Sequence, residues 1–190
     1  RSSRMGVVEI LMIAVGVSMD AFAVSICKGL SVRKLRPSYP LSAALWFGGF
    51  QALMPLLGYF LGVSFADLVG TVDHWIAFVL LGIIGGNMIK DSFAKDSACS
   101  VDSDFSFKTM LAMAVATSVD ALAVGVSFAF LRVNIWLAVL LIGITTAAFS
   151  GVGIVVGNMF GCRFKSKAQL AGGIILVAMG CKILLEHLFL

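Results

Sequence analysis

Charged residues are scarce in this chain. Asp, Glu, Lys and Arg together make up 13% of its 190 residues, whereas 60% of the residues are hydrophobic. Soluble domains carry about 25% charged and about 45–50% apolar residues. The mean hydropathy of +1.05 departs from a soluble composition in the same direction. This composition excludes a single soluble domain, a disordered chain and a coiled coil.

Cysteine and histidine are also few. The four cysteines show no CxxC spacing, and the two histidines stand at the ends of hydrophobic runs. A zinc or copper site built from thiolate and imidazole therefore has little support, and no disulfide framework is expected. Lys and Arg are spread between the hydrophobic runs instead of gathering on one face. This distribution argues against a nucleic-acid partner despite the net charge of +4.

Long hydrophobic runs dominate the chain. A membrane helix needs about 20 mostly apolar residues. Six windows meet this requirement, at about 6–27, 41–65, 73–92, 109–131, 134–161 and 168–190. We therefore predict an all-α membrane protein with six transmembrane helices in a lipid bilayer. The first run continues past its Ala-Phe-Ala sequence at 21–23, so we expect a membrane helix there and not a cleaved signal peptide.

The connections between the runs set the expected topology. The breaks near 66–73 and 131–134 are short, which predicts tight antiparallel hairpins. One side of the predicted membrane carries ten Lys and Arg residues, and the other side carries three. The ten are Lys28, Arg33, Lys34, Arg36, Lys90, Lys95, Lys108, Arg163, Lys165 and Lys167. The positive-inside rule makes the ten-charge side cytoplasmic, so both termini are predicted to lie outside the cytoplasm.

The chain contains an internal repeat. Residues 14–24 match residues 114–124 at seven of eleven positions, including Asp20 and Asp120. A second series, at an offset of 95, pairs glycines of the second and fifth runs. Because each half has three spans, the second copy enters the membrane from the opposite side. This predicts two inverted three-helix repeats in one membrane domain, over 1–95 and 109–190, joined by a cytoplasmic linker over 96–108.

Two aspartates lie inside hydrophobic runs. Asp20 stands about two-thirds along its window, and Asp120 stands at the middle of its own. A charge at the bilayer centre costs about 2.5–3.5 kcal/mol, so each needs a basic partner, protonation or a bound cation. Lys182 is the basic residue within a span, and its nearest partner in sequence is Glu186. We predict that Asp20 and Asp120 bind a divalent cation; a protonated, hydrogen-bonded pair is the alternative.

Other polar residues in the runs could add oxygen ligands. Gln51, Thr117 and Asn87 carry amide or hydroxyl oxygens, which suit Mn²⁺, Mg²⁺ or Ca²⁺ without separating them. Isolated polar residues also bond across helices, so a structural role is the alternative for each. Small residues flank both aspartates at helical spacing and would allow close helix packing. They are Gly16, Ala23, Ala116 and Ala123.

Several motifs together resemble the MntP-type manganese efflux pump family. They are Ser-Met-Asp-Ala-Phe-Ala at 18–23, Phe-Gly-Gly-Phe-Gln at 47–51, Met-Pro-Leu at 54–56, Asp-His-Trp-Ile-Ala-Phe at 73–78 and Ala-Thr-Ser-Val-Asp at 116–120. The resemblance implies a bacterial inner-membrane exporter that moves Mn²⁺ out of the cytoplasm as its substrate, without a cofactor. It maps the family's paired membrane aspartates onto Asp20 and Asp120. Some members carry Glu where this chain has Gln51, so for this chain the resemblance implies a site with two carboxylates.

The leading hypothesis is export of Mn²⁺ by alternating access, which makes the protein a transporter and not an enzyme. Protons as counter-ions and a homodimer are further hypotheses. The alternative is an exporter of another divalent cation or a small amino acid on the same six-span plan. An intramembrane aspartyl protease is disfavoured, because Asp20 and Asp120 follow Ser-Met and Ser-Val instead of Gly-x-Gly. A passive channel is a further alternative, which differs from an exporter only in lacking a gated transport cycle.

Overall fold

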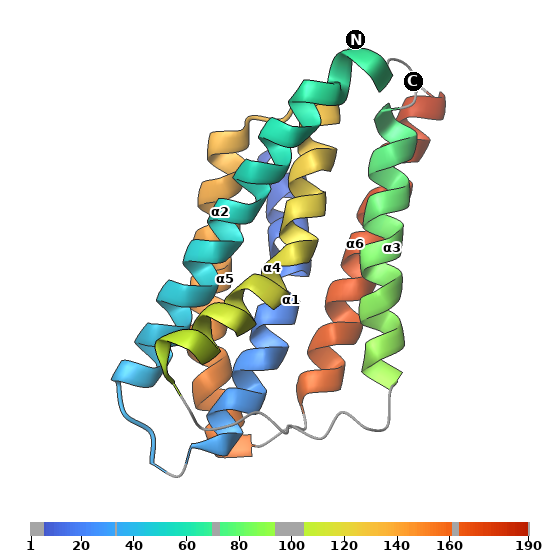
Figure 1. The fold of residues 1–190 in the computed structure, drawn as a ribbon. Helices are drawn as coiled ribbons and strands as arrows, with labels where there is room; N and C mark the ends of the chain where they lie inside the picture. The colour runs from blue at the N-terminus through green and yellow to red at the C-terminus, as the bar shows by residue number, and fades with distance from the viewer. Residues whose placement is uncertain (1–5, 33, 70–72, 94–104, 161–163, 190) are drawn as a thin grey trace.

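The computed structural model describes residues 6–32, 34–69, 73–93, 105–160 and 164–189, and within them all side chains except those of 65–69, 73–74 and 186–189. These residues form six helices and no strand, which confirms the all-α prediction (Figure 1). The helices are α1 (Val7–Ser31), α2 (Ser38–Val69), α3 (Asp73–Phe93), α4 (Phe107–Phe130), α5 (Ile135–Phe160) and α6 (Lys165–Phe189). Each predicted window coincides with one helix to within four residues at either end.

All six helices are long and apolar enough to cross a membrane, so the chain is a multi-pass membrane protein. We call the end of the bundle where α1 begins and α2, α4 and α6 end the upper end, as in Figure 1, and the opposite end the lower end. The predicted linker over 96–108 overlaps the start of α4 at Phe107. Its residues 96–104 lie outside the described part of the chain.

Helices that are far apart in sequence pack against each other. The main contacts join α1 to α5, α2 to α4, and α3 to α6, with further packing of α2 on α5 and of α1 on α6. Helices that follow each other, such as α4 and α5, contact each other far less. The chain turns there through Arg132, whose φ is 52°, and Val133 N donates to Phe128 O at 3.1 Å.

The predicted tight hairpins are therefore only partly right. The turn over 131–134 is short, as expected, but α4 and α5 diverge from it because each packs on a helix of the other half. The second predicted hairpin, near 66–73, includes residues 70–72, which lie outside the described residues.

Glycines permit the closest helix contacts. A Cβ atom on Gly157 of α5 would overlap the carbonyl oxygen of Ile26 in α1, and one on Gly58 of α2 would overlap that of Leu122 in α4. Lipid tails are as apolar as the side chains, so close van der Waals packing holds membrane helices together. These glycines therefore contribute to the two main helix pairs by bringing the backbones together.

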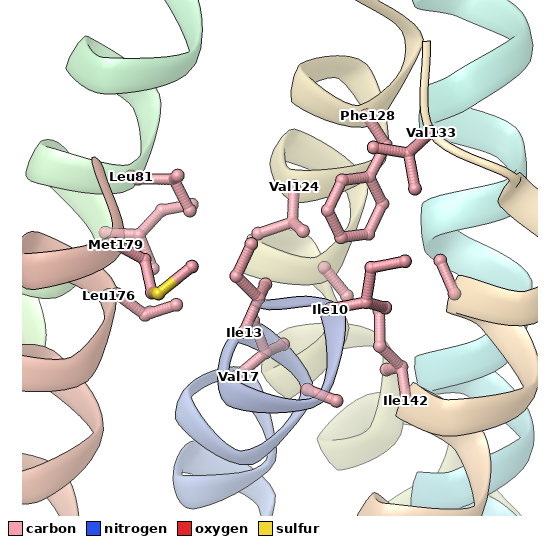
Figure 2. Close-up of a cluster of buried hydrophobic side chains, with 14 of the residues drawn as sticks. Ile10, Ile13, Val17, Leu81, Val124, Phe128, Val133, Ile142, Leu176 and Met179 are labelled. Carbon is pink, nitrogen blue, oxygen red and sulfur yellow. The ribbon is translucent and has the colours of Figure 1, made fainter. Parts of the chain in front are cut away.

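A cluster of buried hydrophobic side chains, which we call the apolar cluster, fills the upper part of the bundle (Figure 2). All of its members on α1 precede Asp20, and all of its members on α4 follow Asp120. On these two helices the cluster therefore lies between the aspartates and the upper end. Figure 2 labels Ile10, Ile13, Val17, Leu81, Val124, Phe128, Val133, Ile142, Leu176 and Met179.

Candidate metal site

Both aspartates lie near the middle of their helices. Asp20 is 13 residues after Val7 and 11 before Ser31, because α1 continues four residues beyond its predicted window. Asp20 therefore lies near the centre of its helix, and the prediction that it lies two-thirds along the span is wrong. Asp120 is 13 residues after Phe107 and 10 before Phe130, as expected for a central position. The two residues thus stand at equivalent depths in α1 and α4.

The two carboxylates lie within electrostatic range of each other. Asp20 and Asp120 are both partly buried. The helices α1 and α4 themselves touch over a short stretch only. A Cβ atom on Gly16 would lie 2.9 Å from Leu176 Cδ2 of α6. Gly16 therefore serves the contact of α1 with α6, and not a close contact with α4.

Two charged residues that sequence reasoning did not assign to the site lie near it. Asp91, close to the end of α3, is exposed and interacts electrostatically with both Asp20 and Asp120. Lys165, the first residue of α6, lies close to Asp20 and to the thiol of Cys27. The exposure of Asp91 is typical of a solvated helix end. A usable signal was its position one turn after Asn87, on the same face of α3.

A layer of polar side chains crosses the bundle one turn from Asp20. Ser18 Oγ donates to Ala14 O at 2.6 Å and lies 2.7 Å from Thr146 Oγ1 of α5. Because a hydroxyl has one hydrogen, Thr146 is the donor to Ser18. From α2, the fully buried Gln51 donates through Nε2 to Val17 O at 3.2 Å.

Gln51 retains an unused oxygen. Its Oε1 atom is buried and has no hydrogen-bond partner among the described residues. Buried polar atoms are nearly always paired, so an unpaired one needs an explanation such as a water or an ion. An amide oxygen is also a suitable ligand for a hard cation. Gln51 therefore remains a candidate ligand, since its amide reaches the turn of α1 that precedes Asp20.

The other two candidate ligands lie differently. Thr117 is buried one turn before Asp120, and its hydroxyl contacts Met113 O at 3.0 Å and Ala114 O at 3.2 Å. Such bonds to the preceding turn often bend a helix, and α4 bends part-way along its length (Figure 1). The oxygen of Thr117 can still accept a bond or bind a cation. Asn87 lies on an exposed face of α3, one turn before Asp91.

Lys182 has a partner that the sequence did not suggest. It forms an ion pair with Glu9, near the start of α1, whose carboxylate also accepts a hydrogen bond from Gly6 N at 2.7 Å. The expected partner, Glu186, has its side chain outside the described residues. The ion pair links α1 to α6 at the upper end, so this lysine is engaged away from Asp20 and Asp120.

The described side chains do not form a complete metal-binding group in this structure. Within the described ranges, no group of three or more His, Cys, Asp and Glu side chains is arranged to hold a metal ion together. Cys27 and Cys181 are free thiols, whereas Cys99 and Cys162 lie outside the described residues. Two carboxylates and an amide, completed by water, would give a hard cation a partly hydrated site. Such a site suits transport, because the ion must leave as well as bind.

The bond between Ser18 and Thr146 gives a first prediction. Hydrogen bonds between membrane helices contribute about 0.6 kcal/mol on average. We expect a coupling free energy of about this size from Ser18→Ala, Thr146→Val and the double variant. The measurement is unfolding of the purified protein by dodecyl sulfate in mixed micelles. Strictly additive effects of the two changes would contradict the bond.

Comparison with known proteins identifies the family. The family model described as "Putative manganese efflux pump" matches residues 34–184. The chain belongs to this family. A protein of Acetivibrio thermocellus named "Putative manganese efflux pump MntP" is 57% identical over 97% of this chain and 93% of its own length. Proteins of the same name from Bifidobacterium adolescentis and Desulfitobacterium hafniense are 56% and 55% identical, over 95% and 97% of this chain and 97% of each relative.

Membership of this family confirms the resemblance stated from the motifs. The relatives are named as efflux pumps, which are transporters, in agreement with the prediction that the chain is not an enzyme. No solved structure matches the chain significantly.

Proposed function

We propose that this chain exports Mn²⁺ from the cytoplasm by alternating access, with Asp20 and Asp120 as its shared metal ligands. The observation that carries the proposal is the pair of carboxylates at mid-depth in α1 and α4, which lie within electrostatic range of each other. The names of the relatives support manganese as the substrate. In this proposal Mn²⁺ is cargo and not a cofactor.

Electrostatics favours a divalent cation between these side chains. Two ionised carboxylates in an apolar span are costly when unpaired, and one divalent ion would neutralise both. Oxygen ligands suit Mn²⁺, and Gln51 Oε1 is a buried oxygen with lone pairs to spare. Thr117 and Asn87 are proposed as further ligands that join the site as the helices move.

The helix contacts support the inverted repeat. Exchanging α1–α3 with α4–α6 turns the α1–α5 contact into the α4–α2 contact, and it maps the α3–α6 and α2–α5 contacts onto themselves. The glycine contacts follow the same exchange: Gly58 faces Leu122, and Gly153 faces Phe22. In transporters built from inverted repeats, the substrate binds near the midplane between the repeats. We propose the same for Asp20 and Asp120.

The distribution of Lys and Arg supports the orientation. We propose that the lower end faces the cytoplasm of a bacterial cell and that both termini lie on the outer side of the inner membrane. Protons are proposed as counter-ions, because carboxylates that have released a metal can return protonated. Transport into vesicles that ignores an imposed pH gradient would exclude this coupling.

Metal binding should stabilise the folded protein. A ligand at 100 times its dissociation constant adds about 2.7 kcal/mol to the free energy of unfolding. We therefore expect Mn²⁺ to raise the melting temperature of the purified protein in detergent, and to do so less or not at all for Asp20→Asn and Asp120→Asn. Asp73→Asn, at the first residue of α3, is the matched control.

The same measurement separates the candidate substrates. Mg²⁺, Ca²⁺, Zn²⁺, Cd²⁺ and small amino acids are compared with Mn²⁺ at equal concentration. A larger shift with one of these than with Mn²⁺ would favour an exporter of that substrate on the same six-span plan. Equal stabilisation of the parent protein and of both aspartate variants would remove the proposed ligands.

A further inference from the structure

The two ends of the bundle are closed to different extents. At the upper end, the apolar cluster draws side chains from α1, α3, α4, α5 and α6, so it spans the space between all of these helices (Figure 2). Hydrophobic constrictions block ions because they exclude water. Every cluster residue on α1 and α4 lies above the aspartates, so among the described residues the cluster places apolar side chains between the aspartates and the upper end.

An ion pair lies next to this cluster. Glu9 of α1 binds Lys182 of α6, and each charged residue is followed directly by a buried cluster member. These members are Ile10, which is 2% exposed, and Ile183, which is 6% exposed. Separating α1 from α6 at the upper end would therefore break the ion pair and split the cluster in the same movement.

Below the aspartates, a second buried apolar cluster joins α1, α2, α4 and α5, but no described residue of α3 or α6 belongs to it. The charged residues that interact with Asp20 from this side lie on α3 and α6. Asp91 is exposed and interacts electrostatically with both Asp20 and Asp120. Lys165, close to Asp20, is partly exposed at the start of α6. The helices α3 and α4 contact each other much less than α3 contacts α6. On the side of α3 and α6, charged side chains thus lie between the two aspartates and the lower end.

We propose that Glu9 and Lys182 form the latch of an outer gate, whose body is the apolar cluster, and that this structure is the conformation in which the metal site opens to the cytoplasm. This inference rests on the proposed function and orientation. Alternating access requires a state with the upper end open. In that state α1 and α6 move apart, Glu9 and Lys182 separate, and the lower end closes around the released site.

The gate can be tested by labelling from outside the cell. The four native cysteines are replaced by serine, and a single cysteine replaces Ala123, which is partly buried against the cluster one turn above Asp120. Intact cells are treated with a membrane-impermeant maleimide. We expect slow labelling in this parent. Glu9→Gln or Lys182→Gln should speed labelling by about two- to fivefold, the effect that a partly exposed ion pair has on a two-state equilibrium.

A charge exchange separates a latch from a general loss of stability. The double variant Glu9→Lys with Lys182→Glu restores an attractive pair and should return labelling to the parental rate, whereas each change alone should speed it. Arg132→Asn is the matched control, because Arg132 is an exposed cation in the turn at the same end. It should leave labelling unchanged.

The experiment distinguishes failure of the proposed latch from failure of the proposed function. Equal labelling of the parent and the Glu9→Gln variant overturns the latch, and so does fast labelling of the charge-exchanged protein. Labelling requires no metal, so it reports on the gate even if the parent fails to export Mn²⁺. Failure of Mn²⁺ export with the labelling pattern intact would remove the proposed substrate and leave the gate in place.

Discussion

Replacing Asp20 or Asp120 with asparagine is expected to abolish manganese export. Asparagine keeps the size of the side chain but removes the negative charge that balances a divalent ion. Changes to residues that merely support a metal ligand already reduce metal affinity by about 10–100-fold, so loss of a ligand should lower efflux by at least about 100-fold. The measurement is release of radioactive Mn²⁺ from loaded cells, normalised to the amount of protein in the membrane.

The same substitution tests the structural alternative. If the aspartates serve as protonated hydrogen-bonding groups, asparagine should replace them with little loss, because an amide resembles a neutral carboxyl group in shape and hydrogen bonding. Asp73→Asn serves again as the matched control and should export normally. Efflux at the parental rate from either Asp20→Asn or Asp120→Asn would remove the metal-site hypothesis.

Gly157→Ala is expected to cause the largest loss of stability. The added methyl group would overlap the carbonyl oxygen of Ile26, and a backbone atom cannot turn aside as a flexible side chain can. Overpacking costs about 1–3 kcal/mol, and 1 kcal/mol shifts the melting temperature of a chain of this size by about 2–4 °C. We therefore expect the melting temperature in detergent to fall by about 5–10 °C.

Two other glycines complete this experiment. Gly58→Ala should cause a similar loss, because its Cβ atom would overlap Leu122 O in the other main helix pair, α2 with α4. A Cβ atom on Gly82 meets nothing within 4 Å, so Gly82→Ala should leave stability unchanged or slightly higher. Equal melting temperatures for the Gly157 and Gly82 variants would contradict the close approach of α1 and α5.

The helices and the aspartates could be predicted from the sequence, whereas the helix partners could not. Length and hydropathy alone decide whether a segment spans a membrane, and a charge inside such a segment is conspicuous. Lipid-facing and buried sides of a membrane helix are both apolar, so the pattern does not identify the packed face. In α2, for example, Leu45 and Leu53 are exposed while Ala43 and Phe47 are buried.

The roles of charged residues near helix ends could not be predicted from the sequence either. Glu9, Asp91 and Lys165 look in sequence like ordinary solvated ends, and only the packing of α1, α3 and α6 shows what lies beside them. Polar residues inside a span were easier to find than to interpret. Gln51 and Thr117 are both buried, yet one retains an unused oxygen whereas the other bonds to its own helix.

The crossed pairing of helices has a consequence for how the protein is made. α1, α2 and α3 each find their main partner among α4, α5 and α6. A nascent chain that has inserted only its first three helices therefore has almost nothing to pack against within itself. Packing of α2 and α1 must wait until α4 and α5 have been made, and packing of α3 until α6 has left the ribosome. Until then the early helices depend on lipid or on the insertion machinery for their surroundings.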